Sequence, residues 1–282
     1  MRQRLSGAAA ALAVAAVAVL PGAASADDAG SLTAASGQVQ ATLTWKQAKY
    51  GVADPHLTVV RAGATLFDAS LVSVSDGCGD GYCRFLPSGK RKSALQVVDL
   101  NGDGEPEVLV DAYTGGAHCC AITEILAFNA TGYAPTEAHW GNVGYDLEDL
   151  DHDGRPELVA LDDAFAGAFT SYAATFFPPL VLDYDPSARG VLRDVTRRFP
   201  ALVRRNQGQA LHALSKARRG HYETLGAVAA YVADLYLLGR AKDVRPYLRR
   251  ARRRGDLRDV SGRAPRSFDR DLLAFLHKQG YR

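Results

Sequence analysis

The chain has 282 residues, of which 47% are apolar and 23% are charged, and its formal net charge is +2. This is the composition of a globular protein, and it excludes a disordered chain. The small net charge hides two oppositely charged parts, because residues 27–188 contain eight basic and 23 acidic residues, whereas residues 189–282 contain 23 basic and eight acidic residues. The sign changes where strand-like sequence gives way to helical sequence, so we predict a β-rich domain over residues 27–200 and a basic helical domain over residues 201–282.

The first 26 residues have the three parts of a secretory signal peptide. Arg2 and Arg4 supply a basic start, residues 8–20 are apolar, and small residues lead up to Ala26. The apolar stretch is shorter than the roughly 20 residues that a helix needs to cross a bilayer, and we therefore expect cleavage after Ala26 rather than a retained membrane anchor. No later segment is apolar enough to span a membrane, so the mature chain is expected to be secreted and extracellular.

Short strands separated by turn residues are expected over most of the acidic part. Alternating apolar and polar residues predict strands at 41–45 and 56–60, with a hairpin turn at 61–64, and the Gly-, Ser- and Cys-rich residues 75–92 predict a disulfide-tied loop. Further strands are expected at residues 94–98, 107–111, 122–128, 156–161 and 180–184. Many short strands with regular turns are typical of a sandwich, a barrel or a propeller unit.

Four cysteines in an exported chain predict disulfide bonds. A bond between Cys78 and Cys83 closes a short loop but leaves Cys119 and Cys120 to bond as neighbours, so bonds between the two pairs are at least as plausible, and the sequence does not decide. His118 next to two cysteines would also fit a Cys-His nucleophile, but an oxidising environment favours structural disulfides. The CxxC and His/Cys spacings of a zinc site are missing.

Two nine-residue segments have nearly the same pattern and lie fifty residues apart. The first loop, residues 99–107, reads DLNGDGEPE, and the second loop, residues 149–157, reads DLDHDGRPE. Calcium takes six to eight oxygen ligands, which positions 1, 3, 5 and 9 supply from side chains and position 7 from its backbone carbonyl, while the glycine at position 6 permits a sharp turn. We therefore predict two bound calcium ions. The predicted ligands are Asp99, Asn101, Asp103, Glu105 and Glu107 in the first loop, and Asp149, Asp151, Asp153, Arg155 and Glu157 in the second.

Both loops differ from an EF-hand, because the twelfth residue is Val110 or Ala160 instead of glutamate and because the flanking segments are strand-like. Each loop follows a short apolar strand and ends in Pro-Glu-aliphatic. In these features residues 94–190 resemble the FG-GAP or VCBS-type repeats of integrin-like β-propellers, and more weakly the periplasmic lysozyme-inhibitor-like proteins. The resemblance implies a small or irregular propeller-like unit, because the β-rich part holds only three or four blades of about 45 to 50 residues.

An aromatic run follows the second loop, and we expect it to be core, with a ligand groove as the alternative. Its members are Phe165, Phe169, Tyr172, Phe176 and Phe177.

Beyond Phe199 the apolar residues recur at helical spacing, and they predict one apolar face on a helix over residues 221–238. Asp243 is expected to cap a second helix that has Pro246 in its first turn, and a third helix is expected over residues 267–279. The predicted fold class is therefore α+β, a mainly antiparallel β part followed by a C-terminal α-helical domain.

The arginine-rich residues 245–258 lie in the second of these helices. We expect them to form a solvated face that partly docks on the acidic part, and the alternative is binding to an anionic polymer or membrane. Nucleic acid is not favoured as a partner.

The expected function is that of a secreted, calcium-binding, disulfide-stabilised β module, which acts in binding or structure at or outside the cell surface and has no catalytic residues. Its partner would be a protein or a cell-surface polymer. Two alternatives stay open: an inhibitor of an extracellular hydrolase such as lysozyme, and a secreted enzyme on a propeller-like scaffold. The GxSxG, HExxH and phosphate-loop motifs are missing from the sequence.

Overall fold

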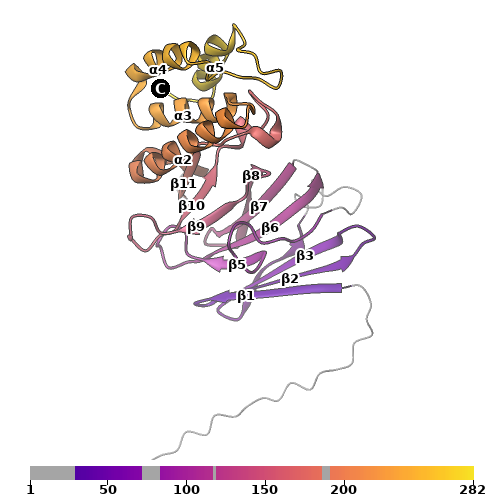
Figure 1. Cartoon of the computed structure of the whole chain (residues 1–282). Helices are drawn as coiled ribbons and strands as arrows, with labels where there is room; N and C mark the ends of the chain where they lie inside the picture. Colours follow the sequence, from indigo (N-terminus) through magenta and orange to yellow (C-terminus); the bar gives the residue numbers. More distant parts are fainter. Residues whose placement is uncertain (1–28, 72–82, 117–118, 186–190) are drawn as a thin grey trace, which may run out of the picture.

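The computed structural model describes residues 29–71, 83–116, 119–185 and 191–282. The predicted signal peptide, Cys78 and His118 lie outside these residues. The described chain forms three four-stranded antiparallel sheets followed by four α-helices (Figure 1). The predicted α+β class, with a β part followed by a helical part, is confirmed. Among the described helices, none has the length and apolar character needed to cross a membrane.

The first sheet contains the strands β1 (Ala29–Ser36), β2 (Val39–Gln47), β3 (Val52–Arg61) and β4 (Ala64–Ser70), in that order. Its strands join through tight turns. Ala62 and Gly63, between β3 and β4, both have positive φ angles, of 49° and 83°. Such a two-residue turn matches the twist of a hairpin, and it confirms the turn predicted at residues 61–64.

The other two sheets repeat this plan. The second contains β5 (Leu95–Val98), β6 (Glu107–Gly116), β7 (Cys119–Phe128) and β8 (Tyr133–Gly141), and the third contains β9 (Tyr145–Glu148), β10 (Glu157–Leu161), β11 (Pro179–Asp185) and β12 (Val191–Asp194). All neighbouring strands pair in chain order and antiparallel. Each sheet is thus a four-stranded meander, which is the unit of a propeller blade.

In the described part of the chain the three sheets are open, and successive sheets share a core. On β6, Val108 and Val110 lie in the core that includes Leu43 and Leu57 of the first sheet, whereas Leu109 lies in the core shared with the third sheet. Because neighbouring residues of a strand point to opposite faces, the unbroken apolar run of β6 is what a strand buried on both faces requires.

The far side of the third sheet is covered by the connection into the helices. Val181 of β11 packs with Val195 and with Phe199, which directly precedes the first α-helix. The short 3₁₀ helix η5 (Thr196–Arg198) lies within this connection. The molecule is therefore a series of layers in chain order, from the first sheet to the helices (Figure 1).

The helical part contains α2 (Pro200–Arg219), α3 (Leu225–Leu237), α4 (Ala241–Arg253) and α5 (Phe268–Lys278). The helix predicted at 221–238 is confirmed as α3, although it begins at Leu225. Its burial is not limited to one apolar face, because twelve of its 13 residues are buried. It is the central helix of the cluster, and a helix surrounded by others needs small and apolar residues on every side.

The predicted cap at Asp243 is also wrong. α4 already begins at Ala241, so Asp243 is its third residue and Pro246 lies inside the helix instead of in its first turn. The early start follows from the turn after α3, in which Gly239 has a φ of +68° and the N–H of Arg240 donates to the carbonyl of Leu235. The helix predicted at 267–279 is confirmed as α5, with Ser267 and Gln279 as its flanking residues.

The aromatic run connects the β part to the helices, and its prediction as core is confirmed for four of its members. Phe165, in the 3₁₀ helix η2 (Asp163–Phe165), is buried in the helical core, and Phe169, Phe176 and Phe177 pack against that core. Phe165 and Phe169 both meet Phe275 of α5 edge to face, with ring centroids 5.1 Å apart.

Candidate metal centre

The two acidic loops occupy equivalent places in the second and third sheets. The first loop joins β5 to β6, and the second loop joins β9 to β10. In each hairpin the glutamate at position 9 is the first residue of the outgoing strand: Glu107 pairs with Val98, and Glu157 pairs with Glu148. Both loops are therefore flanked by strands, which agrees with the sequence prediction and excludes the helix-loop-helix of an EF-hand.

The carboxylate at position 1 organises each loop in the same way. Asp99 accepts a hydrogen bond from the backbone N–H of Gly104 over 2.9 Å, and Asp149 accepts the equivalent bond from Gly154 over 3.0 Å. These glycines, at position 6, have φ angles of +82° and +88°. An L side chain rarely adopts this conformation, so the glycines permit the turn that brings the later carboxylates back toward position 1.

The glutamate at position 9 closes each loop from the other side. Glu107 accepts from the N–H of Leu100 over 2.9 Å, and Glu157 accepts from the N–H of Leu150 over 2.8 Å. Both glutamates are buried, with 2% and 3% of their surface exposed. One buried glutamate therefore lies beneath each loop. It is the first residue of a strand, and the residue after it belongs to the hydrophobic core.

Burial changes the acidity of these two groups. The pKa of Glu107 is raised to about 7, mainly by burial and also by the nearby carboxylates of Asp103 and Asp99. Burial also raises the pKa of Glu157, and Asp151 adds to the effect. A divalent cation among these oxygens would offset both the burial and the repulsion. The donor set of hard carboxylate and amide oxygens fits calcium.

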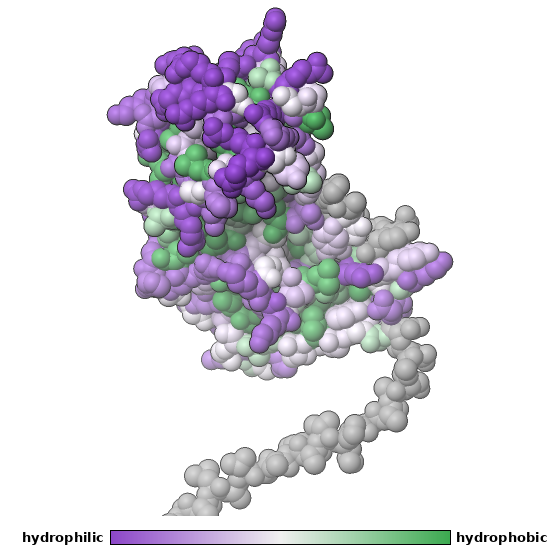
Figure 2. All heavy atoms as spheres, viewed as in Figure 1, coloured by the Kyte–Doolittle hydropathy of each residue, from purple (hydrophilic) through white to green (hydrophobic). Residues whose placement is uncertain are grey.

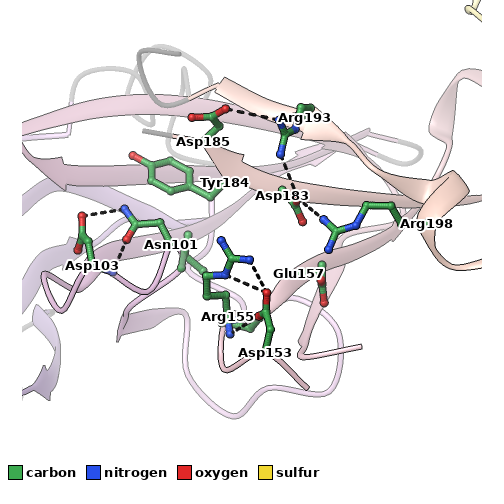
Figure 3. A pocket seen from close by; sticks show the side chains of 12 residues that line it. Asn101, Asp103, Asp153, Arg155, Glu157, Asp183, Tyr184, Asp185, Arg193 and Arg198 are labelled. Carbon is green, nitrogen blue, oxygen red and sulfur yellow. Dashed lines mark hydrogen bonds and ion pairs between the residues drawn. The ribbon is translucent and has the colours of Figure 1, made fainter. Parts of the chain in front are cut away.

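The second loop brings three carboxylates together. One carboxylate oxygen from each of Asp149, Asp151 and Asp153 lies within 4.8 Å of the others. In the first loop the neutral Asn101 takes the place of Asp151, and its amide donates to Asp103 over 3.0 Å (Figure 3). Positions 1, 3 and 5 therefore lie close together in the second loop, whereas in the first loop positions 3 and 5 are in contact. The binding of calcium by these residues stays a prediction.

The side chains at position 7 form ion pairs and are not free to act as ligands. Glu105 forms an ion pair with Arg61 of β3, with Nε 2.7 Å from Oε2. Arg155 pairs with Asp153, with Nε 3.0 Å from Oδ2. Only their backbone carbonyls are left as ligands, which is the role that the sequence assigned to this position. Their backbone N–H groups donate instead to the carboxylate at position 5.

The two loops face one cleft of about 340 Å³ (Figure 3). They also pack on each other, because a Cβ atom added to Gly102 of the first loop would lie 2.9 Å from Cδ of Arg155 in the second. The cleft has both acidic and basic walls. Its charged lining residues are Asp103, Asp153, Arg155, Glu157, Asp183, Asp185, Arg193 and Arg198.

Two arginines in this cleft were missed by the sequence reasoning. Arg198 of η5 donates to Asp151 over 2.6 Å and to Asp183 over 2.6 Å. Arg193 of β12 reaches Asp183 at 3.4 Å and Asp185 at 3.8 Å. Both arginines come about forty residues after the second loop in the sequence. Apart from the change of charge near residue 189, no sequence pattern indicated that they would contact this loop.

The expected docking of residues 245–258 on the acidic part is wrong. Among the described residues, Arg252 is the arginine of α4 in this segment that forms an ion pair. Its partner is Asp269 of the neighbouring helix α5, 2.7 Å away. α4 lies at the end of the molecule opposite the first sheet (Figure 1). Arg193 and Arg198 make the contacts to the acidic part instead, because they lie in the connection that covers the third sheet.

The cysteine predictions are met only in part. Cys83 and Cys120 are disulfide-bonded, and no free cysteine occurs among the described residues. Cys83 belongs to the core shared by the first and second sheets. The pairing of Cys78, Cys83, Cys119 and Cys120 stays a prediction.

No family model matches the chain, and no solved structure matches it with statistical significance. The chain is 33% identical over 151 residues to probable thylakoid lumen protein sll0997 of a Synechocystis strain, which covers 51% of this chain and 44% of that protein. It is 29% identical over 133 residues to uncharacterized protein y4bJ of Sinorhizobium fredii, which covers 46% of this chain and 20% of that protein. The chain thus spans less than half the length of either relative. The resemblance to FG-GAP or VCBS-type repeats stays a prediction.

Proposed function

We propose that this protein is an exported, calcium-binding and disulfide-stabilised β module that acts in binding or structure at or outside the cell surface. The observation that carries the proposal is one hydrogen-bond arrangement repeated in two hairpins, in which the carboxylate at position 1 accepts from the glycine at position 6 and the glutamate at position 9 accepts from the residue at position 2. A chance cluster of surface acids would not repeat the same backbone hydrogen bonds from Asp99 and Asp149, or from Glu107 and Glu157.

Asp99, Asn101, Asp103 and Glu107 would hold one ion, and the equivalent residues Asp149, Asp151, Asp153 and Glu157 would hold the other. Bound calcium would supply positive charge to the buried carboxylates and link the ends of neighbouring strands. The protein's own contribution is to fix the loop by the hydrogen bonds to positions 1 and 9, so that few oxygens need to reorganise on binding. The role is therefore stabilisation of a rigid surface rather than catalysis.

Three observations support export. The sequence begins with the three parts of a secretory signal, and one relative carries the name of a probable thylakoid lumen protein. The disulfide-bonded Cys83 and Cys120 also suit an oxidising compartment. Inhibition of an extracellular hydrolase and catalysis on a propeller-like scaffold stay predictions, since the described cleft favours neither.

Calcium titration of the purified protein tests the proposal. After treatment with chelator and dialysis, isothermal titration calorimetry and elemental analysis should find two calcium ions per chain. Asp99→Asn and Asp149→Asn should each remove one ion, because each replaces the carboxylate that organises its own loop. Asp68→Asn, at an exposed aspartate that pairs with His56 outside the loops, is the matched control and should bind two ions. Absence of calcium uptake by the unmodified protein would refute the proposal.

Thermal unfolding gives an independent check. A ligand that binds only the folded state stabilises it by about 2.7 kcal/mol at a concentration 100 times its dissociation constant. Added calcium should therefore raise the melting temperature of the unmodified protein, and the double variant Asp99→Asn/Asp149→Asn should not respond.

A further inference from the structure

The outer side of α4 is an arginine face that has no acidic partner. We define the α4 basic face as Lys242, Arg245, Arg249, Arg250, Arg253 and Arg254, all of which are exposed. Among the described residues, none of these six side chains makes a hydrogen bond or an ion pair. At 3.6 residues per turn they cover an arc of roughly 200° around the helix.

Several arginines elsewhere in the described chain do have carboxylate partners. In the β part, Arg61, Arg91 and Arg155 each pair with a carboxylate. On the inner side of α4 itself, Arg252 pairs with Asp269. The α4 basic face differs from these arginines in that it gathers six cations without an acidic partner along one helix and its C-terminal end.

The arrangement has a cost in the free protein. Arg245, Arg249 and Arg253 follow one another at four-residue steps, which places them about 6 Å apart in a row along the helix. Like charges at this spacing destabilise a helix by a few tenths of a kcal/mol per pair. A multivalent anion lying along the row would reverse the sign of this interaction.

The composition of the face suits phosphate groups. Five of its six cations are arginine, whose planar guanidinium binds phosphate through two parallel hydrogen bonds. We propose that the α4 basic face binds a linear, phosphate-bearing polyanion, a site that is independent of the calcium loops.

A second copy of this chain is a poorer partner for this face, although its β part is acidic. Several carboxylates of that part already have cations of their own: Asp146 and Glu148 share Lys90, and Asp151 and Asp183 share Arg198. Binding a second copy would require these internal pairs to break.

A lipid bilayer is also a poorer partner. Helices that lie in a membrane interface insert apolar side chains between the lipids. The apolar residues Val244, Leu248 and Ala251 of α4 are buried against the other helices. Hydrophilic side chains cover the helical end of the molecule in the view of Figure 2. The α4 basic face therefore offers charge without a hydrophobic anchor.

Binding of long-chain inorganic polyphosphate to the full chain tests the proposal. Fluorescence anisotropy with labelled polyphosphate, at about 150 mM salt where long-range attraction is screened, should show saturable binding. Arg249→Gln/Arg253→Gln should weaken it at least tenfold and lower the slope of log affinity against log salt by roughly 1.4, since each lost phosphate contact contributes about 0.7 for a flexible strand.

The matched control is Arg204→Gln/Arg205→Gln, which removes two exposed arginines from α2 and changes the net charge by the same amount. This variant should bind polyphosphate as the unmodified protein does. An equal loss of affinity in both variants would refute the proposal, because net charge alone would then explain binding. Melting temperatures of both variants exclude unfolding as a cause.

Binding to a membrane and to a second copy of the chain is measured with the same protein variants. Binding to phosphatidylglycerol vesicles without binding to polyphosphate would overturn the proposal in favour of a membrane. A salt-sensitive dimer in sedimentation, lost in Arg249→Gln/Arg253→Gln, together with absent polyphosphate binding, would overturn it in favour of a second copy.

Discussion

Arg198 Nη2 lies 2.6 Å from Asp151 Oδ2 and thereby ties the second loop to the connection that leads into α2. Asp151 is position 3 of that loop and belongs to its cluster of three carboxylates. The first loop has neutral Asn101 at this position. At positions 1, 3, 5 and 9 the second loop therefore carries one more negative charge than the first, and a guanidinium from another element compensates it.

Arg198→Gln should tighten calcium binding at the second loop, because calcium and the guanidinium compete for Asp151. In chelator the same variant should lose only about 0.5 to 1 kcal/mol of unfolding free energy, since the arginine is 44% exposed and such pairs are weak. Calorimetric titration checks the first expectation and urea unfolding the second. Arg193→Gln, which contacts Asp183 and Asp185 but not the loop, should leave calcium affinity nearly unchanged. This prediction depends on the proposed calcium binding.

Asp234, in the last turn of α3, should make stability fall as the pH rises. It is fully buried, neither of its oxygens has a hydrogen-bond partner among the described residues, and burial raises its pKa to about 8. Between pH 3.8, the ordinary pKa of an aspartate, and about pH 8, the folded state keeps a proton that the unfolded state has lost. The free energy of unfolding therefore decreases as the pH rises through this range.

Asp234→Asn should remove much of this decrease, on the order of a few kcal/mol between pH 4 and pH 8. Urea unfolding at a series of pH values in chelator measures it. Asp54→Asn, at an exposed aspartate of β3, is the control and should keep the decrease. A pH profile that Asp234→Asn leaves unaltered would contradict the prediction.

Two neighbouring residues of the second loop should respond to substitution with opposite signs. Gly154 has a φ of +88°, and Ala there should cost about 1 to 2 kcal/mol. His152 has a φ of +63° without being glycine, and His152→Gly should stabilise the protein by up to about 1 kcal/mol. Thermal melting in chelator compares them, and destabilisation by both would show that His152 makes contacts that outweigh its backbone strain.

Leu158 of β10 should be among the most sensitive core positions. It is completely buried in the core that the second and third sheets share. Leu158→Ala should cost about 2 to 5 kcal/mol of unfolding free energy. Leu211→Ala removes the same atoms from α2, where the side chain is 43% exposed, and should change stability by less than about 0.5 kcal/mol. Urea unfolding of the two variants checks the contrast.

The features that the sequence predicts well depend on residues close together in the chain. The two loops could be found because their ligands and their position-6 glycines all lie within nine residues, and the turn at residues 61–64 because its residues set their own φ angles. The helix at 267–279 was found because Ser267 and Gly280 mark its ends.

The features that were missed depend on distant residues. Arg198 meets Asp151 only because β12 folds back and pairs with β11. No pattern of neighbouring residues in the sequence predicts this pairing. α2 escaped prediction because its buried residues are few and include a polar one, Asn206. The single apolar face expected for α3 was wrong because packing partners, and not its own period, decide how much of a helix is buried.

The layered order of the sheets bears on how the chain could fold after export. Each sheet pairs strands that are neighbours in sequence, and each shares its core with the sheet that precedes or follows it along the chain. Contacts of this kind form quickly, because only short segments must close on themselves. A polypeptide that emerges from a translocation channel with its N-terminus first can thus complete one layer before the next arrives, and the helices close the open side of the third sheet last.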